Sequence, residues 1–256
     1  MDGPVHDAMR RMAGSTARLL PQARYGRMIV VLSHMRGATT ALSHVLCAHP
    51  AVSGYGETHV AHDGASAPGR VLVNLARRGA FDPRAPRLLD KILHDRLDAA
   101  PPASFYAARA VFLLRAPGPA VASILRLGAR TGLAEGASAE TAARYYAARV
   151  ERLATHWDRF APGRRCGLST AALLADPDAA LAALGPVLGL RPPLVNRYAA
   201  HPAARAEGAG DPTRSAGLAR IAAGTEPEMP LDGVGPALAA RCAAAHAALA
   251  ARFAAG

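Results

Sequence analysis

A basic residue and two threonines follow an apolar run near the start of the chain, and together they could bind a phosphate. Met28 to Ser33 form an apolar run with β-branched residues, typical of a strand buried on both faces. The loop 34–38 contains Arg36, and Thr39 and Thr40 begin a helical pattern. Backbone N–H groups at a helix start, an arginine and two hydroxyls are suitable phosphate ligands. The alternative is an ordinary turn whose threonine caps the helix.

This loop differs from the ATP-binding loop of many kinases. The pattern G-x-x-x-x-G-K followed by Ser or Thr is absent, because no lysine precedes the threonine pair. No acidic residue is clearly placed to bind Mg²⁺. The sequence therefore disfavours a small-molecule kinase that uses ATP and Mg²⁺, but this class stays an alternative.

A second arginine lies at the end of another predicted strand. Ala110 to Leu114 form that strand, Arg115 follows it, and a helix that begins near Pro119 contains Ser123 and Arg126. In parallel sheets, ligands bind in the crevice at the carboxyl ends of the strands, so we expect Arg115 and Ser123 to face one site. Arg126, one turn after Ser123, would add charge to it.

The two motifs resemble the nucleotide-binding motifs of sulfotransferases that use 3′-phosphoadenosine-5′-phosphosulfate (PAPS). The family's 5′-phosphosulfate loop is commonly Pro, Arg or Lys, Ser, Gly, Thr, Thr; here it reads Met35-Arg36-Gly37-Ala38-Thr39-Thr40. Ala38 has a Cβ where the family usually has none, and Gly37 next to it could supply the backbone freedom. The family's second motif, Arg, Asp or Asn, Pro and a serine six residues later, matches 115–123, with alanine at the second position.

The resemblance implies a donor site. The residues expected to bind the 5′-phosphosulfate are Arg36, Gly37, Ala38, Thr39 and Thr40, and those expected to bind the 3′-phosphate are Arg115 and Ser123, with Arg126 nearby. A third segment, 205–212, resembles the late glycine-rich segment that closes over the 3′-phosphate, with Arg205, Gly208 and Gly210 as its candidates. The alternative for this segment is a surface turn. The family needs no metal, and the sequence contains no cluster of metal ligands.

The same resemblance implies in-line sulfuryl transfer to a hydroxyl, which needs a base and cations. Arg36 and Lys91, the only lysine in the chain, are the expected cations. Glu57 is the first candidate for the base, His94 the second and His59 the third. Each could instead be an ordinary surface or packed residue. His34, inside the phosphate loop, either lines the site or packs.

The rest of the chain alternates predicted strands and helices. Further strands are expected at 88–93 and 166–169, and helices at 39–49, 139–160, 170–175, 177–188 and 234–255. Residues 58–87 and 127–140 are expected to form lids or acceptor walls. This pattern predicts an α/β fold of three layers, α/β/α, with a central parallel sheet and a P-loop-like phosphate-binding loop. We expect one domain: a lead-in (1–26), the donor-binding core with acceptor loops (28–217), and a C-terminal helical segment (218–256).

The composition limits the partners. The formal net charge is +11, with 30 Lys plus Arg, which suits a polyanion such as a nucleotide. Three widely spaced cysteines argue against disulfides or zinc. We expect a cytoplasmic, bacterial enzyme without membrane or nucleic-acid partners, and a homodimer is an open alternative. Its acceptor would be a small phenol or alcohol of secondary metabolism, or a carbohydrate.

Two further alternatives remain. One is a sulfotransferase that binds the product PAP (adenosine 3′,5′-bisphosphate) without turnover. The other is a non-catalytic basic nucleotide- or nucleic-acid-binding protein.

Overall fold

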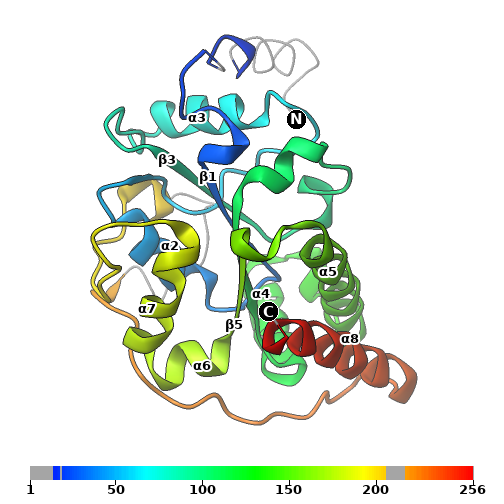
Figure 1. The fold of residues 1–256 in the computed structure, drawn as a ribbon. Coiled ribbons are helices and arrows are strands. Elements are labelled where there is room, and N and C mark those ends of the chain that lie inside the picture. Colours follow the sequence, from blue (N-terminus) through cyan, green and yellow to red (C-terminus); the bar gives the residue numbers. More distant parts are fainter. Residues whose placement is uncertain (1–13, 18, 206–216, 256) are drawn as a thin grey trace.

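A computed structural model describes residues 14–17, 19–205 and 217–255 and contains a five-stranded sheet (Figure 1). All pairs of neighbouring strands are parallel, and the strand order is β2-β3-β1-β4-β5. The strands are β1 Met28–Ser33, β2 Val52–Ser53, β3 Arg87–Ile92, β4 Arg109–Leu114 and β5 Arg165–Ser169. β1 therefore lies at the centre, and the loop that follows it opens at the carboxyl edge of the sheet.

Helices follow most of the strands. They are α2 Thr39–Cys47, α3 Ala67–Arg77, α4 Pro117–Thr131, α5 Ala139–Arg159, α6 Thr170–Ala175, α7 Pro177–Leu188 and α8 Pro236–Ala254. Short 3-10 helices connect them: η1 Tyr25–Arg27, η2 Asp95–Leu97, η3 Ala103–Ala107, η4 Ala134–Gly136, η5 Pro162–Arg164 and η6 Pro202–Arg205. No helix among the described residues is long and apolar enough to cross a membrane.

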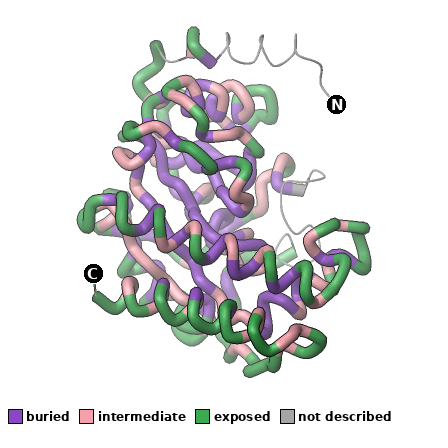
Figure 2. The backbone as a smooth tube through the Cα atoms, turned by 90° about the vertical axis from the view of Figure 1, so that its right-hand side faces the viewer, coloured by how far each residue is buried: buried purple, intermediate pink, exposed green. Residues whose placement is uncertain are grey.

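The central strand is buried on both faces because its residues alternate between two hydrophobic clusters. Val30 and Leu32 pack with residues of α3, α4, α5 and α8, and Ile29 and Val31 pack with residues of α2, α6 and α7. All six residues of β1 are buried, whereas the outer sides of the helices are exposed (Figure 2). The fold is therefore the predicted three-layer α/β/α arrangement with a parallel sheet.

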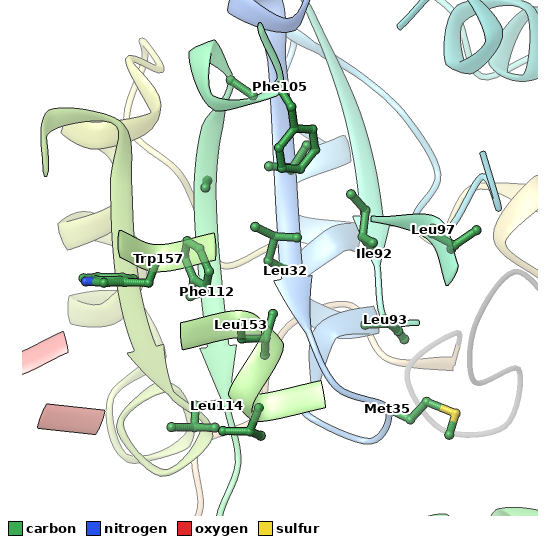
Figure 3. Packing of buried hydrophobic residues seen from close by; sticks show 14 of the residues in the cluster. Leu32, Met35, Ile92, Leu93, Leu97, Phe105, Phe112, Leu114, Leu153 and Trp157 are labelled. Atoms are coloured by element: carbon green, nitrogen blue, oxygen red, sulfur yellow. The ribbon is translucent and has the colours of Figure 1, made fainter. Parts of the chain in front are cut away.

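Aromatic residues fill the layer between the sheet and α5. The ring of Phe112 lies 5.1 Å from that of Trp157 in an edge-to-face geometry (Figure 3). In the same view, Phe105 lies at the end of the sheet where β4 begins, and Leu114 and Met35 lie at the opposite, carboxyl end. This packing holds α5 against the sheet, so that its polar side chains can reach the carboxyl ends of the strands.

Three local predictions need correction. Residues 58–87 are not loop throughout, because they contain α3, whose start lacks a side-chain cap. The helix expected to begin near Pro119 begins at Pro117 and extends to Thr131, into the region expected to be a lid. The two-residue strand β2 was not predicted, since so short a strand has no periodicity to detect.

Candidate active site

The loop between β1 and α2 has an unusual backbone. Arg36 and Ala38 have left-handed conformations, with φ of 65° and 62°, although neither is glycine. Each costs roughly 1–2 kcal/mol, so the surrounding structure must stabilise them. Ala38 is the N-cap of α2 and supplies no side-chain cap. The first N–H groups of α2 are thus left without a capping side chain, which suits an external anion.

Gly37 was expected to supply the backbone freedom that Ala38 lacks. It does not, since Ala38 itself has the left-handed conformation. Gly37 instead allows close packing. A Cβ at this position would lie 2.7 Å from the Ser33 Oγ, and the Gly37 carbonyl accepts a hydrogen bond from the Thr170 hydroxyl at 3.1 Å. The loop is therefore fixed against the end of β1 and the start of α6.

Three of the side chains expected to bind phosphate groups lie together. The Arg36 Nε donates to the Ser123 Oγ at 2.9 Å, and an Arg115 Nη1 donates to the Arg36 carbonyl at 3.0 Å. Arg115 Nε also forms a hydrogen bond and ion pair with Glu226 Oε1. The loop after β1 and the helix after β4 thus place two guanidinium groups and a hydroxyl in one cluster.

Of the remaining proposed phosphate ligands, Arg126 is described by the structure and is not part of this cluster. Arg126 is exposed on α4 and makes no hydrogen bond or ion pair within the described part of the chain. Gly208 and Gly210 lie outside the described residues, as does the side chain of Arg205, whose backbone ends η6. Their roles stay predictions.

His34 connects the loop to the end of β4. Its ring is fully buried, which lowers its pKa to about 4. The Arg115 backbone N–H donates to its Nε2 at 3.1 Å, so Nδ1 carries the proton and donates to the Met35 carbonyl at 2.8 Å. His34 is therefore a packed, neutral residue that fixes the backbones of Met35 and Arg115. The sequence had left its role open.

Helix α5 holds the carboxyl ends of three strands. The Met35 N–H donates to the Tyr145 hydroxyl at 2.9 Å, and that hydroxyl donates to the Leu93 carbonyl at 2.7 Å. The Tyr146 hydroxyl donates to the Arg115 carbonyl at 2.7 Å. Sequence analysis predicted the helix over 139–160 but not these contacts, because periodicity reveals which face is buried but not which carbonyls a phenol reaches.

Arg149, which also lies on α5, makes further hydrogen bonds to the ends of the strands. It was not identified from the sequence. Its guanidinium is fully buried and donates to the carbonyls of Ser33 and Ile92, each at 2.9 Å. It also pairs with the buried carboxylate of Asp98 at 2.7 Å. Despite the effect of burial, Arg149 and His156 hold the pKa of Asp98 below its usual value.

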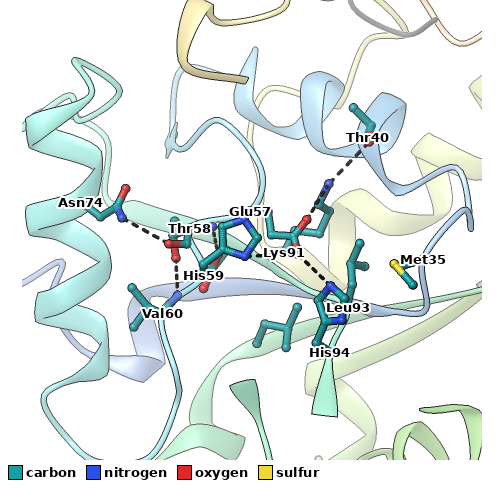
Figure 4. Close-up of polar contacts among 12 residues, drawn as sticks. Met35, Thr40, Glu57, Thr58, His59, Val60, Asn74, Lys91, Leu93 and His94 are labelled. Atoms are coloured by element: carbon teal, nitrogen blue, oxygen red, sulfur yellow. Dashed lines mark hydrogen bonds and ion pairs between the residues drawn. The ribbon is translucent and has the colours of Figure 1, made fainter. Parts of the chain in front are cut away.

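Lys91 and the three candidate bases form a second cluster, whereas Arg36 lies in the first (Figure 4). Lys91 is 1% exposed, and its Nζ lies 3.6 Å from Glu57 Oε2 and 3.5 Å from the Thr40 Oγ1. The other carboxylate oxygen, Oε1, lies 3.8 Å from His59 Nδ1 and 3.9 Å from His94 Nε2. All three candidate bases therefore meet at one carboxylate, next to the first turn of α2.

The electrostatics of this cluster follow from its burial. Burial lowers the pKa of Lys91, although the nearby Glu57 carboxylate opposes the effect, and burial likewise lowers the pKa of His94. Glu57 is 4% exposed, and its Oε1 accepts no hydrogen bond from the described residues. A buried carboxylate oxygen without a hydrogen bond is costly, and a hydroxyl donor would satisfy it.

A buried aspartate positions Glu57. Asp90, next to Lys91 in β3, accepts hydrogen bonds at 2.9 Å from the Thr58 N–H and from the His62 Nε2. These bonds fix the segment after Glu57 against β3. A charged pair, Asp90 and Lys91, inside an otherwise apolar strand was the sequence signal for this arrangement, but it did not reveal His62.

A cavity of about 510 Å³ lies beside this cluster, between residues 58–63 and α3. Thr58 and His59, the two residues after Glu57, form part of its wall. The rest of the wall is both apolar and polar, and its residues are Val60, Ala61, Asp63, Arg70, Val73, Asn74, Arg77 and Arg78. No group of three or more His, Cys, Asp or Glu residues that could hold a metal occurs among residues 14–17, 19–205 and 217–255.

The chain is similar in structure to the sulfotransferase domain from the curacin biosynthetic pathway. The TM-score is 0.50 and the sequence identity is 16%, and the match covers 84% of this chain and 95% of that domain. No family model matches the chain, and no curated protein has significant sequence similarity to it. The likeness shows that the chain has the sulfotransferase fold.

Proposed function

We propose that this protein transfers a sulfuryl group from PAPS to a hydroxyl group of a small molecule. The observation that carries the proposal is the placement of two clusters at one edge of a sulfotransferase fold. One cluster contains Arg36, Arg115 and Ser123, and the other contains Glu57 and Lys91. They meet at α2, whose first turn contributes Thr40 to the second cluster.

The donor would lie across the loop and the start of α4. The uncapped first turn of α2, with Arg36, Thr39 and Thr40, would bind the 5′-phosphosulfate. Arg115 and Ser123 would bind the 3′-phosphate. The Glu226 carboxylate on Arg115 supports this assignment, because it indicates that the position accepts an anion. Arg126, Arg205, Gly208 and Gly210 are proposed to complete this part of the site.

Each residue of the second cluster has a chemical task. PAPS, when bound, supplies an activated sulfuryl group with a phosphate leaving group. Glu57 Oε1, which accepts no hydrogen bond from the residues that the structure describes, would take the proton of the acceptor hydroxyl. Lys91, held between Glu57 and Thr40, would donate to the sulfuryl oxygens, and Arg36 would stabilise charge on the leaving phosphate.

The acceptor would enter through the cavity beside Thr58 and His59. Its volume of about 510 Å³ is within the range of small-molecule sites. A phenol or alcohol of secondary metabolism is the first candidate and a carbohydrate the second. The transfer is proposed to need no metal.

Calorimetric titration with PAP tests the donor site, with ATP and Mg²⁺ as the comparison. We expect the wild-type protein to bind PAP and not ATP, and Arg115→Ala to lose PAP binding. Arg130→Ala, which changes an exposed arginine in the helix that follows Arg115, is the matched control and should bind PAP like the wild type. A folded wild-type protein that does not bind PAP would refute the proposal. Binding of ATP with Mg²⁺ instead would favour the kinase alternative.

A further inference from the structure

One acidic side chain points inward from an otherwise exposed segment. Residues 222–230 connect the region after η6 to α8, and every residue in this range except Glu226 is exposed. The Glu226 side chain is only 7% exposed, although its neighbour Glu228 is exposed. A carboxylate is rarely buried without a partner. The residue that Glu226 contacts therefore indicates the function of this segment.

That partner is Arg115, the residue proposed to bind the 3′-phosphate. Arg115 Nε forms a hydrogen bond and ion pair with Glu226 Oε1. Arg115 also donates to the Arg36 carbonyl, so this guanidinium remains in the cluster whichever anion it binds. A carboxylate and a phosphate both accept charge-assisted hydrogen bonds from arginine. Glu226 thus occupies the Arg115 guanidinium, to which the 3′-phosphate of the donor is proposed to bind.

The segment is attached by hydrogen bonds at its start and is loosely held beyond that point. Asn196 exchanges two hydrogen bonds with the backbone of Ile221, and the Gly224 N–H donates to the Leu174 carbonyl. Residues 225–230 form no backbone hydrogen bonds with the described residues. Figure 1 shows this orange segment running along the lower side of the molecule from the region of α6 and α7 to α8.

The segment also passes close to the start of α4. The Met229 carbonyl lies so near Gly118 that a Cβ there would overlap it. Gly118 follows Arg115 by three residues, so the segment covers the end of β4 where the 3′-phosphate is proposed to bind. Displacement of residues 225–230 would break the ion pair and the Met229 contact without breaking any backbone hydrogen bond.

We propose that Glu226 is a built-in competitor of the 3′-phosphate of the donor. This inference rests on the proposed function. The donor must displace the carboxylate from Arg115, which weakens its binding, and the return of the carboxylate promotes release of PAP after transfer. The competition is specific to nucleotides that carry a 3′-phosphate.

The test compares Glu226→Gln with Glu228→Gln, which removes the same charge from an exposed position two residues away. The ligands are PAP and AMP, which differ in the 3′-phosphate, and calorimetry measures Kd. We expect Glu226→Gln to bind PAP at least tenfold more tightly than the wild type. Glu228→Gln should change PAP binding less than twofold, and both variants should bind AMP like the wild type.

A second variant, Glu226→Ala, covers the case in which the glutamine amide remains bound to Arg115. If the wild type binds PAP but neither variant binds it more tightly, Glu226 only positions Arg115 and the inference is wrong, while the proposed function stands. Equal tightening for AMP and PAP would also contradict it, since the effect would not involve the 3′-phosphate. If none of the folded proteins binds PAP, the proposed function fails and this inference fails with it.

Discussion

Glu57 and Lys91 are opposite charges that are both almost completely removed from water. Burying each charge is expensive, and their separation of 3.6 Å only partly offsets that cost. A protein seldom keeps such a pair in place of apolar residues without a use for it, and perturbed, buried groups of this kind concentrate at functional sites. The pair lies beside a cavity and beside the first turn of α2, where a reactive group of the donor would lie.

Glu57→Gln tests the role of the carboxylate. The amide has nearly the same shape but cannot take a proton, so we expect kcat to fall about 10²–10⁴-fold. The Kd for PAP should stay close to that of the wild type, because Glu57 is not proposed to touch the nucleotide. Single-turnover assays with labelled PAPS and a phenol panel would measure the rate.

Glu140→Gln, an exposed glutamate that pairs with Arg144, is the control and should keep full activity. Full activity of Glu57→Gln would exclude Glu57 as the base. In that case His94→Gln, which removes the second candidate beside the same carboxylate, should abolish turnover.

His34 predicts a pH dependence of stability. Its folded pKa of about 4 lies below its usual value of 6.5, so the unfolded chain binds a proton more readily. The stability that His34 contributes is complete above about pH 6.5 and is lost as the pH falls toward 4. The loss amounts to about 3 kcal/mol.

Urea unfolding of the wild type and of His34→Gln between pH 4 and pH 7 would measure this effect. Carboxylates contribute to both proteins, so the difference between the two curves isolates His34. The wild type should lose about 3 kcal/mol more than the variant over this range. Parallel curves would show that His34 is not held neutral by burial.

At the level of elements, helix α5 determines the geometry of the site more than the loops do. Tyr145, Tyr146 and Arg149 together bond to the backbone at the ends of β1, β3 and β4. The left-handed conformations of Arg36 and Ala38 occur in the loop that this framework holds. A rigid helix that supports a strained loop would hold the proposed phosphate ligands in place before a nucleotide binds.

The elements themselves could be predicted from the sequence where their periodicity is strong. The apolar run of β1 and the alternation around it indicated the parallel sheet, and the glycine at 189 indicated the end of α7. α3 was missed because its first turn contains Pro68 and Gly69 and the helix also contains polar residues, so its pattern resembles a loop. The contact between Glu226 and Arg115 joins residues 111 positions apart, and no local pattern could reveal it.

Strand β5 is the edge strand nearest α8, and Gly167 explains how the helix covers it. A Cβ on Gly167 would overlap the ring of Phe253 from α8. We expect Gly167→Ala to destabilise the protein by about 1–3 kcal/mol, because the ring must move out of its packed position. Gly163→Ala is the control, since nothing lies within 4 Å of a Cβ there. Chemical denaturation would compare them, and equal stabilities would show that α8 does not pack closely on β5.

For the whole molecule, ion pairs with carboxylates offset part of the positive charge behind the net charge of +11. Many of the arginines are paired with carboxylates distributed over different elements. The pairs include Arg70–Asp63, Arg84–Asp82, Arg144–Glu140, Arg149–Asp98, Arg241–Glu151 and Arg252–Asp158. Exposed pairs contribute little to stability, but they reduce the positive charge that a long polyanion would meet.

This distribution predicts weak binding of nucleic acids. A protein that binds DNA or RNA as its function presents a continuous basic surface, and its affinity falls steeply with salt. We expect a labelled 20-nucleotide single strand to bind with a Kd weaker than about 10⁻⁶ M at 0.15 M salt, as for non-specific contacts. Fluorescence anisotropy would measure this Kd, and PAP should not displace the strand. If the strand binds with a tighter Kd and PAP displaces it, the two anions compete for the guanidinium groups of Arg36 and Arg115. That outcome would mean that this site belongs to a nucleic-acid-binding protein.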